Sequence, residues 1–413
     1  MHQFFESNPM VYEACFDPSR IVKLTYGTTK GCYFGQNAIS KFEEILEDIK
    51  PSGIGFVTGK SSYKSCGAWK VIEPLLAARN IPYKHFDGTS ANPTGESVTA
   101  AVNLFRGIHD DKFIIVAIGG GSPIDCAKSV AVLMEYPDKT VHDLYFHRFT
   151  PEKATKLVAI NLTAGTGTEV DMFAVVSLLD VEPPVKPVLA TPVIHPYYSI
   201  NDPNLTKSLG RTQTMYTALD LLNHIMESVT TTVRTPFSLS LGLHAVQLTK
   251  KYLPIVLEDL NNDVGRYWLM YSAAIAGMAF NESLLHATHA IEHTLSAVVP
   301  DLAHGLGLAM IMPAVFRHIY PAVGPILAEV FGPLIGDSFV GAPEEAEAAS
   351  AALRAWLESV GMKDTLSNYG FKEADIPKLV QYTRDCPGMA GLLSLCPIPV
   401  TDEDMATIFR RSL

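Results

Sequence analysis

The stretch FIIVAIGGGSPIDCAKSVAV, residues 113–132, decides the fold of the first half of this chain. Its apolar start is typical of a strand buried on both faces, and its end has the composition of a helix that carries Asp125 and Lys128. Between them lies a loop of Gly119, Gly120, Gly121 and Ser122. Glycines let the backbone approach a phosphate, and free amides at a helix start attract an anion. The stretch therefore predicts a pyrophosphate site, although a plain tight turn explains the glycines alone equally well.

Similar strand and helix units surround this stretch between residues 53 and 205. Apolar runs at 53–59 and 156–165 also end in Gly, Ser or Thr, and helical patterns at 68–80 and 97–107 lie between the predicted strands. This alternation predicts a parallel sheet flanked by helices. The loop with Thr163 and Thr166 would then meet the glycine loop at neighbouring strand ends, where open sheets bind ligands.

The pattern changes after about residue 206 to long helical periods, for example at 214–229, 267–283 and 344–360. The connecting segment, 181–205, contains six prolines. We therefore expect an α/β dinucleotide-binding domain over residues 1–205 and an all-α domain over 206–413, with a cleft between them. Two domains also suit a chain of 413 residues.

Charge and cysteine usage exclude several classes of partner. The net charge is −11, from 43 acidic and 32 basic residues, which disfavours nucleic acid and anionic membranes. The N-terminus lacks a leader pattern, and we expect no apolar run of the ~18 residues that span a bilayer. The cysteines, without a CxxC pair, predict neither a disulfide framework nor a thiolate zinc site; they are Cys15, Cys32, Cys66, Cys126, Cys386 and Cys396. A soluble cytoplasmic protein that binds small molecules is expected.

The end of the strand at 53–59 bears on the choice of dinucleotide. An acidic residue there would bind the ribose hydroxyls, but Gly59 occupies the position. The residues that follow, Lys60, Ser61, Ser62 and Lys64, offer donors and positive charge. They favour NADP over NAD because they suit a 2′-phosphate, although a solvated polar loop explains them equally well.

Candidate metal ligands lie in the second half. Asp220 and His224 are four residues apart, so a helix would place them on one face, with Glu227 close enough to support them. Such a pair is common and also fits a surface contact.

A histidine cluster follows in NESLLHATHAIEHTLSAVVPDLAHGLGLAM, residues 281–310, where four of the 13 histidines fall within 19 positions. His286, His289 and His293 are predicted to share one helical face, and His304 precedes a second helix. One carboxylate with several imidazoles suits Fe(II), Zn(II) or Co(II) better than Ca or Mg. Spacing alone does not choose among the clustered histidines, and a structural hydrogen-bonded network is the alternative.

Taken together, these motifs resemble the iron-containing (group III) alcohol dehydrogenases, which are related in fold to glycerol dehydrogenase and dehydroquinate synthase. The resemblance covers almost the whole chain. It is carried by YFGQNAISKFEEIL (33–46), DGTSANPT (87–94), GGGSPIDCAK (119–128), TAGTGTE (163–169), the DxxxHxxE of Asp220 to Glu227, and HAIEH (289–293) followed by HG. The family fold implied is an N-terminal dinucleotide-binding α/β domain with an all-α metal-binding domain.

The resemblance implies a metal-dependent alcohol dehydrogenase or aldehyde reductase that transfers a hydride between NAD(P)(H) and a small primary alcohol or aldehyde. Homo-oligomers, dimers or larger, are usual in the family. The implied ligands of Fe2+, or of Zn2+ or another divalent ion, are Asp220, His224, His289 and His304, and His293 would lie unligated beside substrate and nicotinamide. The expected cofactor contacts are Gly59, Ser61, Ser62, Asn92, Gly119, Gly120, Gly121, Ser122, Asp125, Thr163, Thr166 and Lys186.

Some residues depart from the family pattern, and other functions are open. His286 stands where the family usually has Gly, so it would contact substrate or only pack; Ala218 also replaces a Gly. A lyase like dehydroquinate synthase, or an enzyme like glycerol dehydrogenase, would use the same fold, but the lyase needs many cations and few Lys or Arg surround the ligands. A non-catalytic dinucleotide-binding protein with structural histidines is the third alternative.

Overall fold

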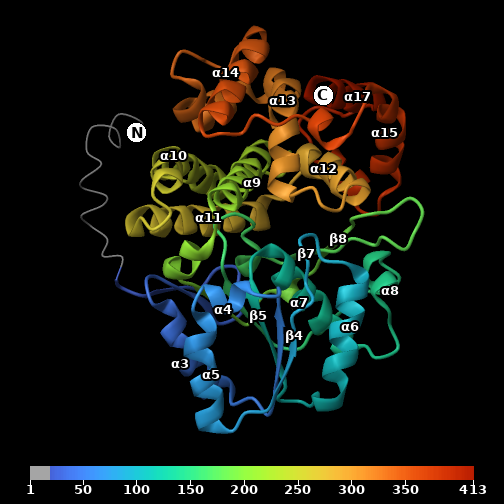
Figure 1. The fold of residues 1–413 in the computed structure, drawn as a ribbon. Helices are drawn as coiled ribbons and strands as arrows, with labels where there is room; N and C mark the ends of the chain where they lie inside the picture. The colour runs from blue at the N-terminus through green and yellow to red at the C-terminus, as the bar shows by residue number, and fades with distance from the viewer. Residues whose placement is uncertain (1–18) are drawn as a thin grey trace.

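A seven-stranded sheet forms the centre of the first half of the chain in this computed structural model, which describes residues 19–413 (Figure 1). Residues 1–18, with Cys15 and the start examined for a leader, lie outside the described residues. The strand order is β1-β2-β9-β6-β5-β3-β4, and every neighbouring pair is parallel except β1 with β2. The strands are β1 (Val22–Leu24), β2 (Gly31–Phe34), β3 (Ile54–Thr58), β4 (Tyr83–Phe86), β5 (Ile114–Gly119), β6 (Leu157–Asn161) and β9 (Tyr198–Asn201).

Helices cover both faces of this sheet (Figure 1). Alternate residues of β5 pack on opposite sides: Ile114 and Val116 join the cluster that holds α3 and α5, whereas Ile115 and Ala117 join the cluster that holds α6 and α7. Burial on both faces explains the continuous apolar runs of these strands. The helices are α3 (Phe42–Ile49), α4 (Ser62–Ser65), α5 (Ala68–Arg79), α6 (Gly95–Phe105), α7 (Gly121–Glu135) and α8 (Val141–Tyr145). The predicted doubly covered parallel sheet is confirmed.

The second half is helical and contains the long helices that the sequence predicted (Figure 1). The antiparallel pair β7 (Phe173–Val175) and β8 (Val188–Ala190) lies before it in the chain. The last strand of the large sheet ends at Asn201 and the first long helix begins at Arg211. The helices are α9 (Arg211–Thr230), α10 (Pro236–Glu258), α11 (Asp263–Ser283), α12 (Ala287–Val298), α13 (His304–Ile335), α14 (Ala346–Ser359), α15 (Ile376–Asp385), α16 (Met389–Ser394) and α17 (Asp402–Ser412).

One helix, α13, is long and apolar enough to be tested as a membrane span, although Arg317 and Glu329 interrupt its apolar residues. It has 32 residues and meets that test by length and composition, but 78% of its apolar window is buried inside the protein. A break at Val323, between Pro321 and Pro325, divides it. Its apolarity is therefore explained by its position in the core.

The sheet order places a switch point between β3 and β5. The chain passes from β3 to β4 on one side, then crosses to β5 on the other side of β3. Ligands of open α/β sheets bind at the carboxyl ends of strands at such a point. Gly59 follows β3 and the glycine loop follows β5, so both lie at this edge.

Candidate metal and nucleotide site

A cavity of about 660 Å3 lies where the strand ends of the sheet meet α9, α12 and α13. It brings together residues of both halves that the sequence singled out. They are Gly59, Ser62, Asn92, Gly120, Gly121, Ser122, Asp125, Thr163, Thr166, Lys186, Asp220, His224, His289, His293 and His304. Ser61 and Gly119 are neighbours of lining residues in the chain but do not line the cavity themselves.

Three imidazoles surround one carboxylate oxygen in this cavity. The Oδ1 atom of Asp220 lies 3.4 Å from Nε2 of His224, 3.8 Å from Nε2 of His289 and 4.0 Å from Nε2 of His304. Ligands bound at about 2 Å to one ion stand a little over 3 Å apart, so the four atoms need only a small contraction. Asp220 Oδ1 and His289 Nε2 are buried and have no hydrogen-bond partner among residues 19–413. This donor set fits a divalent metal ion.

The protonation of the cluster also suits a cation. Burial would raise the pKa of Asp220, but the imidazoles of His224, His289 and His304 bring it down to about 2. Burial lowers the pKa of His224 to about 4 and holds the pKa of His304 well below its usual range. An ionised carboxylate and neutral imidazoles are the forms that bind metal.

His289 differs from the other imidazoles because it contacts a second carboxylate. Its Nδ1 atom makes a short contact with Oε2 of Glu227, which lies on α9 two turns after Asp220. Burial would lower the pKa of His289, but Glu227 and Asp220 raise it to about 9. A metal ion that binds Nε2 must therefore displace a proton, while Glu227 holds the ring by its other nitrogen.

His286 does not share the helical face of His289 and His293, so that prediction is wrong. Helix α12 begins at Ala287, one residue later, because the Glu227 carboxylate accepts the backbone N–H groups of His286 at 3.0 Å and Thr288 at 2.8 Å. The His286 side chain is fully buried, its Nε2 lies 2.9 Å from Oγ1 of Thr230, and it does not line the cavity. The structure thus places His286 in buried packing, outside the cavity lining.

His293 lines the cavity beside the cluster. Its ring centroid lies 5.6 Å from that of His304 and 6.3 Å from that of His289. Burial and the Lys186 ammonium hold its pKa well below the usual range. Its Nδ1 is buried without a hydrogen-bond partner in the described part of the chain. A neutral imidazole with an unused nitrogen is therefore available to a ligand.

The glycine loop and the threonine loop form one cradle at the start of α7. No side chain of the described residues caps this helix at Gly120, so its first amides are free. A Cβ atom at Gly120 would stand 2.5 Å from Cγ2 of Thr163, and one at Gly121 would stand 2.7 Å from Cγ2 of Thr166. Only glycine fits this close approach, and the cradle suits a pyrophosphate.

Two polar residues, the half-buried Asp125 and the buried Lys128, support the cradle. Asp125 accepts a hydrogen bond from Oγ1 of Thr168 at 2.7 Å and from the backbone N–H of Val175 at 3.0 Å. Lys128 is fully buried, and its Nζ donates to Thr168 at 2.9 Å and to Asp171 at 2.6 Å. These contacts tie α7 to the segment that follows the threonine loop.

Asn92 and Lys186 join the two halves at the edge of the cavity. The Asn92 amide nitrogen donates to the carbonyl oxygens of Pro300 and Leu302, both at 3.0 Å, and its oxygen accepts from Lys186 Nζ at 2.9 Å. Pro300 and Leu302 belong to the loop that leads to His304. Both side chains remain on the cavity wall, where the sequence placed cofactor contacts.

Many residues that line the cavity have apolar side chains, here called the apolar wall, and sequence reasoning missed most of them. Leu392 and Leu395 come from the segment around α16, more than 80 positions after the last proposed ligand, and no local pattern assigns them to the site. The apolar wall includes Phe173, Val175, Val188, Phe280, Leu284, Leu285, Leu392 and Leu395. A substrate beside the metal cluster would therefore contact hydrocarbon.

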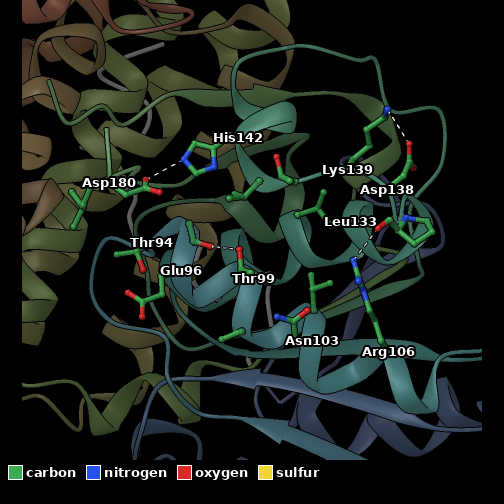
Figure 2. Close-up of a pocket in the computed structure, with 17 residues that line it drawn as sticks. Thr94, Glu96, Thr99, Asn103, Arg106, Leu133, Asp138, Lys139, His142 and Asp180 are labelled. Atoms are coloured by element: carbon green, nitrogen blue, oxygen red, sulfur yellow. Dashed lines mark hydrogen bonds and ion pairs between the residues drawn. The ribbon is translucent and has the colours of Figure 1, made fainter. Parts of the chain in front are cut away.

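A second hollow, of about 960 Å3, lies between α6 and α8 and is larger than the first (Figure 2). Most of its charged side chains are engaged: Nε2 of His142 lies 3.1 Å from Oδ1 of Asp180, Lys139 pairs with Asp138 at 3.0 Å, and Arg106 donates to the Pro137 carbonyl at 3.3 Å. None of the proposed metal ligands lines it. Size alone therefore does not locate the chemistry.

The fold and the cluster define a metal-dependent dehydrogenase with a dinucleotide cradle, and sequence comparison names the family. Residues 29–203 match the family Iron-containing alcohol dehydrogenase, and residues 214–413 match the Fe-containing alcohol dehydrogenase family, C-terminal. The chain belongs to this family.

Individual relatives match this chain along almost its whole length. The chain is 43% identical to the long-chain primary alcohol dehydrogenase of Thermoanaerobacter ethanolicus, covering 97% of this chain and 100% of the relative. Among solved structures, an archaeal halo-thermophilic alcohol dehydrogenase from a Red Sea brine pool has a TM-score of 0.86 at 25% identity, covering 95% and 98%. The NADH-dependent butanol dehydrogenase A of Thermotoga maritima has a TM-score of 0.83 at 26% identity, covering 93% and 97%.

These matches confirm the expected fold and chemistry. The chain is an oxidoreductase of the iron-containing alcohol dehydrogenase type that acts on CH–OH groups, with a divalent metal and a nicotinamide cofactor.

Proposed function

We propose that this protein interconverts aliphatic primary alcohols and their aldehydes, prefers chains longer than ethanol, and uses NADP more efficiently than NAD. Fe2+, or Zn2+ or another divalent ion in its place, would be held by Asp220, His224, His289 and His304. The observation that carries the substrate class is the apolar wall, in which the ring centroid of Phe280 lies 4.5 Å from that of His224. Apolar lining with a few placed polar groups favours a hydrocarbon ligand with one polar end. The name of the Thermoanaerobacter relative agrees with this class.

The preference for NADP rests on residues of this chain. Gly59 lines the cavity without a carboxylate, and Ser62 beside it has a hydroxyl that can donate. Lys60, Ser61 and Lys64 are exposed next to it. A 2′-phosphate would gain charge and hydrogen bonds here, and no acidic side chain at residue 59 would repel it. Relatives of both kinds occur, because the Thermotoga protein is named for NADH and a butanol dehydrogenase of Clostridium saccharobutylicum is named for NADPH.

Each part of the site would contribute a separate step. A bound divalent cation acts as a Lewis acid toward the alcohol or carbonyl oxygen, and the nicotinamide exchanges the hydride. The amides at the start of α7 would bind the pyrophosphate, with Thr163 and Thr166 beside it. His293, neutral because its pKa is far below 7, would accept the hydroxyl proton at its unpartnered Nδ1 during oxidation and return it during reduction. The leucines of the apolar wall would exclude water from the hydride path.

A lyase that acts on a multiply anionic substrate fits this cavity poorly. Among the cavity-lining residues, all of which belong to residues 19–413, Lys186 is the only Lys or Arg. Its ammonium is already engaged by Asn92 and Ser296. The site therefore offers little positive charge to several carboxylates or phosphates.

We further propose a cytoplasmic enzyme that forms a homodimer or larger homo-oligomer. The boundary between its two domains would fall near residue 205, between the end of β9 and the start of α9.

The test is a panel of primary alcohols and aldehydes from ethanol to decanol, with NADP(H) and NAD(H), after anaerobic loading with Fe2+ or Zn2+. We expect kcat/KM to rise with chain length and to be higher with NADP. Activity with none of these substrates would overturn the proposal, and equal rates along the series would overturn the assigned substrate class.

A further inference from the structure

A second buried carboxylate, Glu292, lies behind the proposed metal ligand His304. We propose that Glu292 is a positioning residue that holds His304 with Nε2 turned toward the metal. This inference rests on the proposed metal site and assigns a role to a residue that neither the motif spacing nor the family resemblance selected.

The contacts of His304 define this role. Oε2 of Glu292 makes a short contact with Nδ1 of His304, while Nε2 of the same ring lies 4.0 Å from Oδ1 of Asp220. An imidazole that binds metal through Nε2 carries its proton on Nδ1, and a carboxylate there fixes both tautomer and ring orientation. Glu292 is fully buried, whereas a quarter of the His304 side chain is exposed. The orientation of the partly exposed His304 ring thus depends on its contact with the buried Glu292 side chain.

Glu292 could instead be a ligand itself, because it forms a compact group with His293 and His304. The position of Lys186 argues against this. Its Nζ lies 3.6 Å from Oε2 of Glu292 and 3.4 Å from Nδ1 of His304, so a cation already stands beside this group. A metal ion between the same atoms would be repelled by the ammonium. In the Asp220 group, Lys186 contacts only His304, through Nδ1 and not through the Nε2 atom that lies near Asp220, so this group is the better metal site.

Helix α13 provides space for this carboxylate. Gly307 lies one turn after His304, and a Cβ atom there would stand 2.7 Å from Oε1 and 2.9 Å from Cγ of Glu292. The glycine therefore lets Glu292 reach the ring from the side of α12. A methyl group at residue 307 would displace the carboxylate without removing its charge.

The experiment compares Glu292→Gln, Glu292→Ala and Gly307→Ala with the wild type and with the matched control Thr294→Val. Thr294 is also buried on α12, but its Oγ1 lies 2.9 Å from Oγ1 of Thr383 and the residue does not line the cavity. For each metal-free protein, the affinity for Co2+ is measured by competition with a chelator. The absorption spectrum of bound Co2+ and the thermal unfolding midpoint of the metal-free protein are recorded beside it.

We expect Glu292→Ala and Gly307→Ala to weaken Co2+ binding about 10- to 100-fold and to alter the Co2+ spectrum, because loss of such orienting partners has costs of this size. Glu292→Gln keeps an acceptor for the Nδ1 proton and should lose less. Thr294→Val should bind Co2+ as the wild type does, whatever its unfolding midpoint.

Two results overturn the inference. The first is wild-type affinity and spectrum in Glu292→Ala. The second is a loss in all four variants, Thr294→Val included, in proportion to their unfolding midpoints, which would indicate a general packing effect. If the wild type binds no Co2+, the proposed metal site itself fails.

Discussion

One carboxylate, that of Glu227, both begins helix α12 and contacts the ring of His289. Its Oε1 atom accepts backbone N–H groups at the first turn, including that of His289 at 3.3 Å, and its Oε2 atom contacts Nδ1 of the same residue. The helix start and the ring orientation therefore depend on one side chain of another helix, α9. This arrangement explains why His286 precedes the helix.

Replacement of Glu227 should therefore damage fold and metal site together. In Glu227→Gln, the amide keeps one acceptor oxygen but loses the charge that His289 faces. Glu227→Ala removes the acceptor oxygens and the charge, and it leaves the buried N–H donors of α12 unpaired. We expect it to lower the free energy of unfolding by about 3 kcal/mol or more. We expect urea unfolding to rank wild type, Glu227→Gln and Glu227→Ala in falling order of stability. An alanine variant within 1 kcal/mol of the wild type would refute the capping role.

His289 and His293 are predicted to respond differently to removal. His289→Ala deletes a ligand and should lose most of its metal on dialysis, together with activity. His293→Ala should retain the metal and lose turnover by about 10- to 1000-fold, in the range for removal of a group that transfers protons. Elemental analysis measures the metal content and steady-state kinetics measures kcat. The control is His109→Gln, at a half-buried histidine that does not line the cavity. Full turnover in a metal-replete His289→Ala enzyme would reject the ligand assignment.

Leu392 should limit the length of the substrate. Leu392→Trp adds volume to the apolar wall, so we expect kcat/KM for decanol to fall by about 10-fold or more, while the value for ethanol changes little. Leu392→Ile conserves volume and serves as the matched control. The measurement is kcat/KM along the alcohol series. Equal losses for ethanol and decanol would show that the residue affects the site generally.

Glu169 should make stability fall with rising pH. Burial raises the pKa of this carboxyl from 4.5 to about 7, and its Oε1 atom accepts a hydrogen bond from the amide of Asn201 at 2.9 Å. Because the pKa is higher in the folded protein than in the unfolded chain, the protonated carboxyl contributes stability that is fully present below pH 4.5. This contribution to the free energy of unfolding is lost as the pH rises through 7. Glu169→Gln resembles the protonated form and should flatten the decline between pH 5 and 8, by up to ~1.4 kcal/mol per pH unit. Identical slopes for both proteins would contradict this. The exposed variant Glu152→Gln controls for net charge.

Local patterns predicted much of the fold. The apolar runs that became β3, β5 and β6 are long and end in glycine or threonine, so their burial was visible in composition. Asp220 and His224 share a helix face because four residues make about one turn. Spacing could not select His289 and His293 from three clustered histidines; the family resemblance did so.

Contacts distant in sequence produced the features that were missed. Helix α12 starts after His286 because Glu227, 59 positions earlier, binds its first amides. The leucines around α16 reach the cavity only after the C-terminal helices fold back over α12. Glu292 gave a weak signal as a charged residue in an apolar helix, but its partner could not be read from the sequence. Periodicity reports which face of an element is buried, and it does not report what covers that face.

The Asn92 amide, which holds the loop before His304, has a thermodynamic consequence. This side chain lies on the wall assigned to the dinucleotide, yet its nitrogen binds the carbonyls of Pro300 and Leu302 on the metal side. If nucleotide binding strengthens the hydrogen bonds of Asn92 to this loop, it changes the free energy with which the metal ion binds beside His304. Such coupling is reciprocal, so any factor by which the nucleotide strengthens ion retention must equal the factor by which the ion strengthens nucleotide affinity.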